Sequence, residues 1–142
     1  MATANPAEAG HHKSSEELYE RFVDTTLPAE EFHHEQHVHV AWLFVCRHGM
    51  PGALGEFTTA IKRFAAAKGA NGLYHETITW AFLLLVAERQ AGTPAATWEA
   101  FAAANPDLLC WKPSVLERYY AKDVLESELA RRVFVMPSAP RP

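Results

Sequence analysis

The spacing of hydrophobic side chains along this chain predicts helices. Within segments between residues 14 and 135, apolar residues return every three or four positions, which is the period of one buried helix face. No segment alternates apolar and polar residues between turn signals, as a half-buried strand does. We therefore expect an all-α fold: a single-domain helical bundle over residues 14–135, with four main helices plus short C-terminal helices.

Residues that start and stop helices give the limits of the predicted elements. Serine, threonine or proline precedes most of the predicted helices, and glycine or proline follows most of them, as expected of caps and stop signals. The four long helices are predicted at 14–24, 28–48, 52–68 and 74–90. The segment 80–86 is hydrophobic on all sides, so the fourth helix is expected to be the most buried element.

Shorter helices and two tails complete the predicted organisation. Thr97, Ser114 and Ser127 are the expected caps of short helices in the C-terminal part of the chain. Residues 1–13 are mostly small and polar, which predicts a disordered N-terminal tail. Residues 136–142 contain three prolines, which predicts an extended C-terminal tail.

Charge and composition exclude some classes of function. The 142-residue chain has a formal net charge of −4 with histidine neutral, whereas a general nucleic-acid binder carries a basic stripe. No apolar run reaches membrane-spanning length, and the N-terminus lacks the apolar core of a signal peptide. We expect a cytoplasmic protein that binds a small-molecule substrate or ligand rather than nucleic acid or membrane, and that can form a homo-oligomer. Cys46 and Cys110 lie among apolar residues and are predicted to be buried free thiols.

Histidines are the distinctive feature of the sequence. His33, His34, His37 and His39 fall within seven residues, and His75 stands near the start of the fourth predicted helix. On a helix, His34 and His37 are three positions apart and His33 and His37 are four apart, so either pair places two rings on one side. Spacing alone leaves both pairs open, whereas His39 points largely elsewhere.

Two imidazoles one helical turn apart can share one metal ion. We therefore predict a metal site formed by His34, His37 and His75, the last contributed by a facing helix. Three protein ligands leave one coordination position open to water, dioxygen or substrate, as in catalytic sites. Burial of several imidazoles is costly unless each has a partner, and a shared metal ion supplies that partner.

Three polar residues near these histidines are candidates for catalysis. Glu30 would lie one turn before His34 on the same side of a continuous helix, and Thr79 would lie one turn after His75. Thr79 could hydrogen-bond a metal ligand or contact the substrate. Glu76 could be a general base, although its simplest role is that of an acid in the first helical turn.

The predicted ligand set favours one copper or zinc ion, and iron becomes an option if Glu30 also binds. Zinc would activate a water, whereas copper or iron would bind dioxygen and oxidise a small molecule. Phe44, Trp80 and Phe82 are expected to line an apolar pocket, which favours an oxidoreductase over a hydrolase or lyase. The alternatives are a histidine cluster at the surface, a metal-free acid/base pocket, and a non-catalytic metal- or ligand-binding module, either a sensor or a protein-interaction domain.

The residues around the histidines also form a composite pattern, FxHxxHxxxAW over residues 32–42 and YHxTxT over residues 74–79. This pattern resembles that of a family of small, mostly uncharacterised bacterial helical proteins. The likeness covers roughly residues 27–137 and includes the segments 104–109, 118–120 and 131–137.

The resemblance implies that His34, rather than His33, acts together with His37, and that His75 joins them. It implies no particular activity, so the expected function rests on the chemistry of the histidines.

Overall fold

The structure is a computed structural model that describes residues 14–138. The predicted disordered tail over 1–13, which contains His11 and His12, lies outside the described residues, as do residues 139–142. Regular structure between residues 14 and 138 is entirely helical, which confirms the all-α class. The finer expectation, a bundle of four main helices, stays a prediction.

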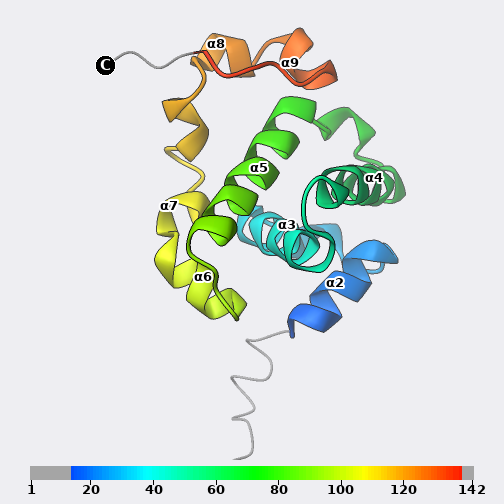
Figure 1. Cartoon of the computed structure of the whole chain (residues 1–142). Coiled ribbons are helices and arrows are strands. Elements are labelled where there is room, and N and C mark those ends of the chain that lie inside the picture. The colour runs from blue at the N-terminus through cyan, green and yellow to red at the C-terminus, as the bar shows by residue number, and fades with distance from the viewer. Residues whose placement is uncertain (1–13, 139–142) are drawn as a thin grey trace, which may run out of the picture.

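The elements follow one another in the order α2 (Ser15–Val23), η1 (Ala29–Glu31), α3 (His34–His48), α4 (Gly52–Ala67), η2 (Asn71–Leu73), α5 (Glu76–Gly92), α6 (Trp98–Ala104), α7 (Pro106–Leu109), η3 (Val115–Arg118), α8 (Lys122–Leu125) and α9 (Glu128–Arg132). Helices α3 and α5 pack against each other at the centre, and α2 and α4 cover one side of α3 (Figure 1). Helix α7 packs on α3 from another side, and α9 packs on α5 near its start (Figure 1).

The core lies where the long helices meet. Helix α3 buries every residue from 38 to 45, because it has packing partners on several sides. Phe22 of α2 is fully buried at the centre of an aromatic cluster. Its ring centre lies 5.2 Å from that of Phe32, 6.2 Å from Phe44, 6.2 Å from Phe57 and 5.0 Å from Phe64.

Side-chain caps confirm the predicted starts of three helices, α2, α6 and α9. The hydroxyl oxygens of Ser14, Thr97 and Ser127 accept hydrogen bonds from backbone N–H groups in the first turns of α2, α6 and α9. The Ser114 hydroxyl accepts a hydrogen bond from the Leu116 N–H in the same way at η3. These bonds satisfy N–H groups that have no partner inside a helix.

The predicted continuous helix over 28–48 is wrong, because the chain breaks at Phe32 and His33. His33 has extended backbone angles (φ −89°, ψ −179°) and caps α3. The Gln36 side-chain oxygen accepts a hydrogen bond from the His33 N–H at 3.0 Å, so this N–H has a local partner outside a helix. Glu30 therefore lies on the separate turn η1 and is exposed, rather than one helical turn before His34.

The predicted burial of both thiols is also wrong, since Cys46 and Cys110 are free but exposed. Cys46 directly follows the buried Val45 of α3, and Cys110 lies two positions after the buried Leu108 of α7. The thiols therefore lie just beyond the last buried residue of each segment and turn outward. No helix among residues 14–138 is long and apolar enough to cross a membrane.

The segment after α9 is held by side chains that the hydrophobic pattern does not identify. The Thr77 hydroxyl donates to the Val133 carbonyl at 2.9 Å and accepts from the Val135 N–H at 3.0 Å. The Tyr120 hydroxyl donates to the Val135 carbonyl at 2.8 Å. These bonds fix the end of the described chain against α5.

Candidate functional site

The predicted ligands His34, His37 and His75 all line one cleft with a volume of about 630 Å³, as does Thr79. The histidines come from separate elements: two from the first turns of α3 and one from the residue before α5. Sequence spacing and tertiary packing thus bring these four residues to the same place. Glu30 and Glu76 do not line this cleft.

The walls of the cleft are mostly apolar, but the predicted aromatic lining is wrong. Aromatic rings are contributed by Phe32, Phe64, Tyr74 and Trp111, and not by the expected Phe44, Trp80 and Phe82. Phe44 belongs to the cluster around Phe22, and Trp80 stacks on Phe134 with 5.4 Å between ring centres. Phe82 is fully buried and packs against His34 at 4.9 Å between ring centres.

His34 is held in one tautomer by the backbone. Its Nε2 lies 2.9 Å from the Leu108 carbonyl oxygen, and because a carbonyl only accepts, Nε2 must be the donor. The neutral ring then carries its lone pair on Nδ1. Burial lowers the pKa of His34 below its ordinary value of 6.5, and the bond to Leu108 offsets part of this effect.

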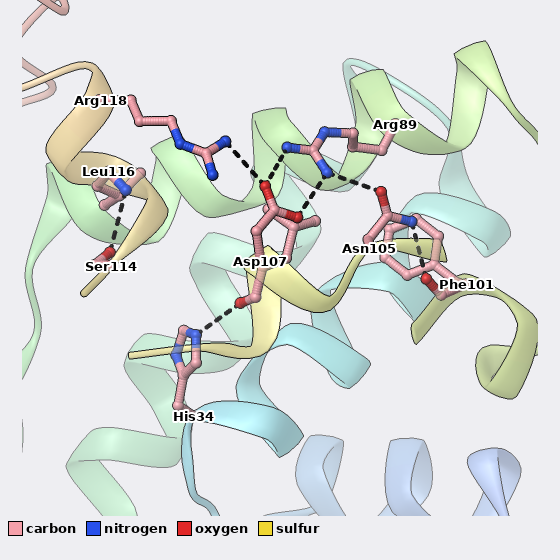
Figure 2. Close-up of polar contacts among 9 residues, drawn as sticks. His34, Arg89, Phe101, Asn105, Asp107, Ser114, Leu116 and Arg118 are labelled. Carbon is pink, nitrogen blue, oxygen red and sulfur yellow. Dashed lines mark hydrogen bonds and ion pairs between the residues drawn. The ribbon is translucent and has the colours of Figure 1, made fainter. Parts of the chain in front are cut away.

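The Leu108 carbonyl is itself held in place by a charged cluster beside α7 (Figure 2). Asp107 accepts two hydrogen bonds from Arg89, at 3.0 and 2.9 Å, and one from Arg118 at 3.0 Å. Arg89 also donates to the Asn105 side-chain oxygen at 2.8 Å. The hydrogen bonds from Arg89, with those from Arg118, lower the pKa of Asp107 to about 2, so this carboxylate stays charged at neutral pH.

Asp107→Asn should change the surroundings of the His34 ring, although Asp107 makes no hydrogen bond to His34. The amide loses the charged pairing with both arginines, which we expect to cost about 1–3 kcal/mol of unfolding free energy. The Leu108 carbonyl should then move, and the imidazole NMR signals of His34 should shift. The matched control is Glu117→Gln, an exposed acid in the neighbouring η3. Unchanged His34 signals in Asp107→Asn would show that the charged cluster does not position the Leu108 carbonyl.

His37 lies among aromatic rings in the cleft. Its ring packs on Phe57 and Phe32, with 5.6 and 5.8 Å between ring centres, and lies 6.4 Å from the His34 ring. No residue within the described part of the chain makes a hydrogen bond to its ring nitrogens. Burial, and to a smaller degree the nearby His34, lowers the pKa of His37 to about 4. The ring is therefore neutral at pH 7.

His75 has both ring nitrogens occupied. It caps α5 with extended backbone angles (φ −135°, ψ 110°), and its Nδ1 accepts the Ile78 N–H at 3.1 Å. Its Nε2 donates to the Leu125 carbonyl oxygen at 2.7 Å. Across residues 14–138, no three histidine, cysteine, aspartate or glutamate side chains are already placed to hold one metal ion.

The remaining candidates have other surroundings. Glu76 accepts a hydrogen bond from the Tyr74 hydroxyl at 2.6 Å, and burial together with this carboxylate raises the pKa of Tyr74. His33 lines the cleft at its exposed edge. His39 faces another side of α3, where it stacks on Trp98 with 4.2 Å between ring centres.

Two basic residues of the cleft, Lys68 and Arg131, were not identified from the sequence. Neither lies at a spacing that relates it to the histidines, and only the fold brings them together. The signal that could have drawn attention to Arg131 is its place in the segment 131–137, which is part of the composite pattern.

Comparison with protein-family models, with curated proteins and with solved structures gave no match. The function is therefore inferred from the residues of the cleft.

Proposed function

We propose that this protein is a small-molecule enzyme in which His34 and His37 hold a transition-metal ion next to an apolar substrate in the cleft. His75 is the third ligand. The observation that carries this proposal is the state of His37, a neutral imidazole in a mostly apolar cleft with no hydrogen-bond partner among the described residues. The ring is only partly exposed in the cleft, and a bound metal ion or ligand would supply the partner that its nitrogens lack.

The environment of His34 supports the same role. Histidines that bind metals usually donate their second ring N–H to a carbonyl or carboxylate, and His34 donates Nε2–H to the Leu108 carbonyl. Its Nδ1 lone pair remains available. The lowered pKa values of His34 and His37 mean that protons compete little with a metal ion at neutral pH.

Binding requires small local changes. With metal–nitrogen distances of about 2.1 Å, two imidazoles on a tetrahedral ion have ring centres roughly 5 Å apart. The ring centres of His34 and His37 are 6.4 Å apart, so a side-chain rotation must bring them closer. His75 must release the Ile78 N–H before it can bind, because its lone pair is on Nδ1 while Nε2 donates to the Leu125 carbonyl. A pair of histidines therefore starts the site and His75 completes it.

The composition of the cleft favours copper or zinc over iron. No carboxylate lines the cleft among the described residues, and Glu30, the predicted extra ligand for iron, is exposed outside it. Imidazole ligands without carboxylate suit copper and zinc. The apolar walls limit the access of water, which supports oxidation of a small molecule rather than hydrolysis.

The second candidate is a metal-free module that binds a small ligand. It is favoured by the saturation of His75, whose two nitrogens already have partners. In that case, His37 would hydrogen-bond the ligand directly and no ion would be needed.

Metal analysis separates the two candidates. The chain should be purified without an affinity tag, dialysed against zinc or copper, and analysed for bound metal. We expect one ion per chain, which His34→Ala and His37→Ala each abolish. His75→Ala should weaken binding without abolishing it, because it completes rather than starts the site.

His48→Ala is the matched control, since His48 lies at the exposed end of the same helix. If the unaltered chain binds neither metal, or if His34→Ala and His37→Ala keep the full metal content, the metal-dependent proposal is wrong.

A further inference from the structure

We infer that the ligand of the cleft is an apolar acid, and that its carboxylate pairs with Arg131. This inference rests on the proposed function only in taking the cleft as the site where the small molecule binds. It adds the chemical class of that molecule and the residue that selects it.

The charges of the lining have one sign. Among the described residues, Lys68 and Arg131 line the cleft and no aspartate or glutamate does. Positive side chains in apolar surroundings stabilise a buried anion, because little water is present to screen them. A neutral ligand would gain nothing from this arrangement, and a cationic one would be repelled.

Arg131 is equipped to bind a carboxylate. One of its terminal nitrogens donates to the Gly72 carbonyl, and the other N–H groups of the guanidinium remain for a ligand. Arg131 forms no ion pair with a carboxylate of the described chain, whereas the adjacent Arg132 lies 3.8 Å from Glu128. The planar guanidinium can donate two parallel hydrogen bonds to one carboxylate.

The position of Arg131 orients the ligand. Arg131, His75 and Trp111 line both this cleft and a second one of about 950 Å³, so Arg131 lies at the boundary between them. A series of ring contacts leads from Trp111 along the cleft. The distances between successive ring centres are 5.0 Å from Trp111 to His34, 6.4 Å from His34 to His37, 5.8 Å from His37 to Phe32 and 4.9 Å from Phe32 to Phe64. A carboxylate at Arg131 therefore lays the rest of the ligand over the histidine pair.

Lys68, the other basic residue of the lining, has a structural role. Its Nζ donates to the Thr25 carbonyl at 2.9 Å and lies 5.3 Å from the centre of the Phe64 ring. These contacts hold the ammonium group beside Phe64. Arg131, rather than Lys68, is therefore the residue that selects the acid.

The size and rim of the cleft define the rest of the ligand. A volume of about 630 Å³ lies within the usual range for small-molecule sites, roughly 300–1,000 Å³. Two lining residues are exposed apolar side chains, Leu73 at 78% and Trp111 at 46%. An alkyl or aryl chain enters across these residues and fills the apolar part.

Octanoate and octanamide test this inference, because they share an apolar chain and differ in charge. Isothermal titration of the zinc-free chain should show octanoate binding at least about tenfold more tightly than octanamide, as expected for a charge-assisted pair in a partly dry site. Arg131→Gln should remove this preference, and Arg131→Lys should keep part of it. Arg132→Gln, one position along the same helix, is the matched control and should keep all of it. Lys68→Gln should change it less than about threefold.

Equal affinity for the acid and the amide, or no binding of either, would overturn the inference. So would a preference that survives Arg131→Gln or disappears in Lys68→Gln. A circular-dichroism melt of each variant shows whether it is folded before titration. The zinc content of Arg131→Gln should stay normal, because Arg131 is not a metal ligand.

The two proposals fail separately. If zinc binds but the acid is not preferred, only the present inference is wrong. If the His34→Ala/His37→Ala double variant lacks zinc and still prefers octanoate through Arg131, the inference holds without the metal.

Discussion

Phe22→Ala is expected to lower the free energy of unfolding by about 3–5 kcal/mol, the usual cost of removing a fully buried phenylalanine ring. Phe22 has no exposed surface and contacts four other aromatic rings. Its removal leaves a cavity that a rigid ring cluster cannot close. Urea unfolding, followed by circular dichroism, measures the change as a lower midpoint at an unchanged m-value.

The same substitution should also loosen the cleft. Phe32 and Phe64 pack against Phe22 and also line the cleft. The affinity for octanoate should therefore fall together with the stability of the fold. Leu129→Ala is the control, because Leu129 is 54% exposed and its truncation should cost no more than about 0.5 kcal/mol. A loss below about 1 kcal/mol for Phe22→Ala would show that the cluster is not the centre of the core.

Acid should destabilise the fold through His39. This side chain is 9% exposed, stacks on Trp98, and has Nε2 2.9 Å from the Ser15 hydroxyl. Burial lowers its pKa to about 4, although Glu99 acts in the opposite direction. The unfolded chain, with a histidine pKa near 6.5, therefore binds a proton that the folded chain does not. The contribution of His39 to the free energy of unfolding is therefore constant above about pH 6.5, falls as the pH drops towards 4, and is lower by about 3 kcal/mol below that.

His39→Phe keeps an aromatic ring on Trp98 and removes the titrating group. Urea midpoints measured between pH 7 and pH 4 should fall less steeply in this variant than in the unaltered chain. The contribution of His37, whose pKa is also about 4, is present in both proteins and cancels in the comparison. His48→Phe, on the exposed end of the same helix, is the matched control. An equal fall in His39→Phe and in the unaltered chain would rule out His39 as the source.

Local sequence was sufficient for most of the helices and for several of their caps. Ser14, Thr97 and Ser127 cap the helices that follow them, because a hydroxyl bonds N–H groups only two or three residues away. The same local rule failed at His33. There, a hydrogen bond from its N–H to Gln36 gave the backbone a second option that the hydrophobic spacing did not reveal.

The sequence correctly predicted that His34, His37 and His75 lie close together. It did not predict their hydrogen bonds. That His34, His37 and His75 share a cleft follows from helical spacing and from the packing of α3 on α5. That His34 and His75 donate to the carbonyls of Leu108 and Leu125 depends on segments 74 and 50 residues further along the chain. No local pattern contains that information.

The sequence by itself therefore determined the all-α class, most helix limits and the histidines that share the cleft. These depend on side-chain periodicity and on bonds between near neighbours in the chain. Only the tertiary structure decided that Glu30 lies outside the cleft, that the His37 ring has no hydrogen-bond partner between residues 14 and 138, and that Arg131 lines the same cleft. The physical reason is that burial, pKa and charge pairing depend on which distant segments exclude water from a side chain.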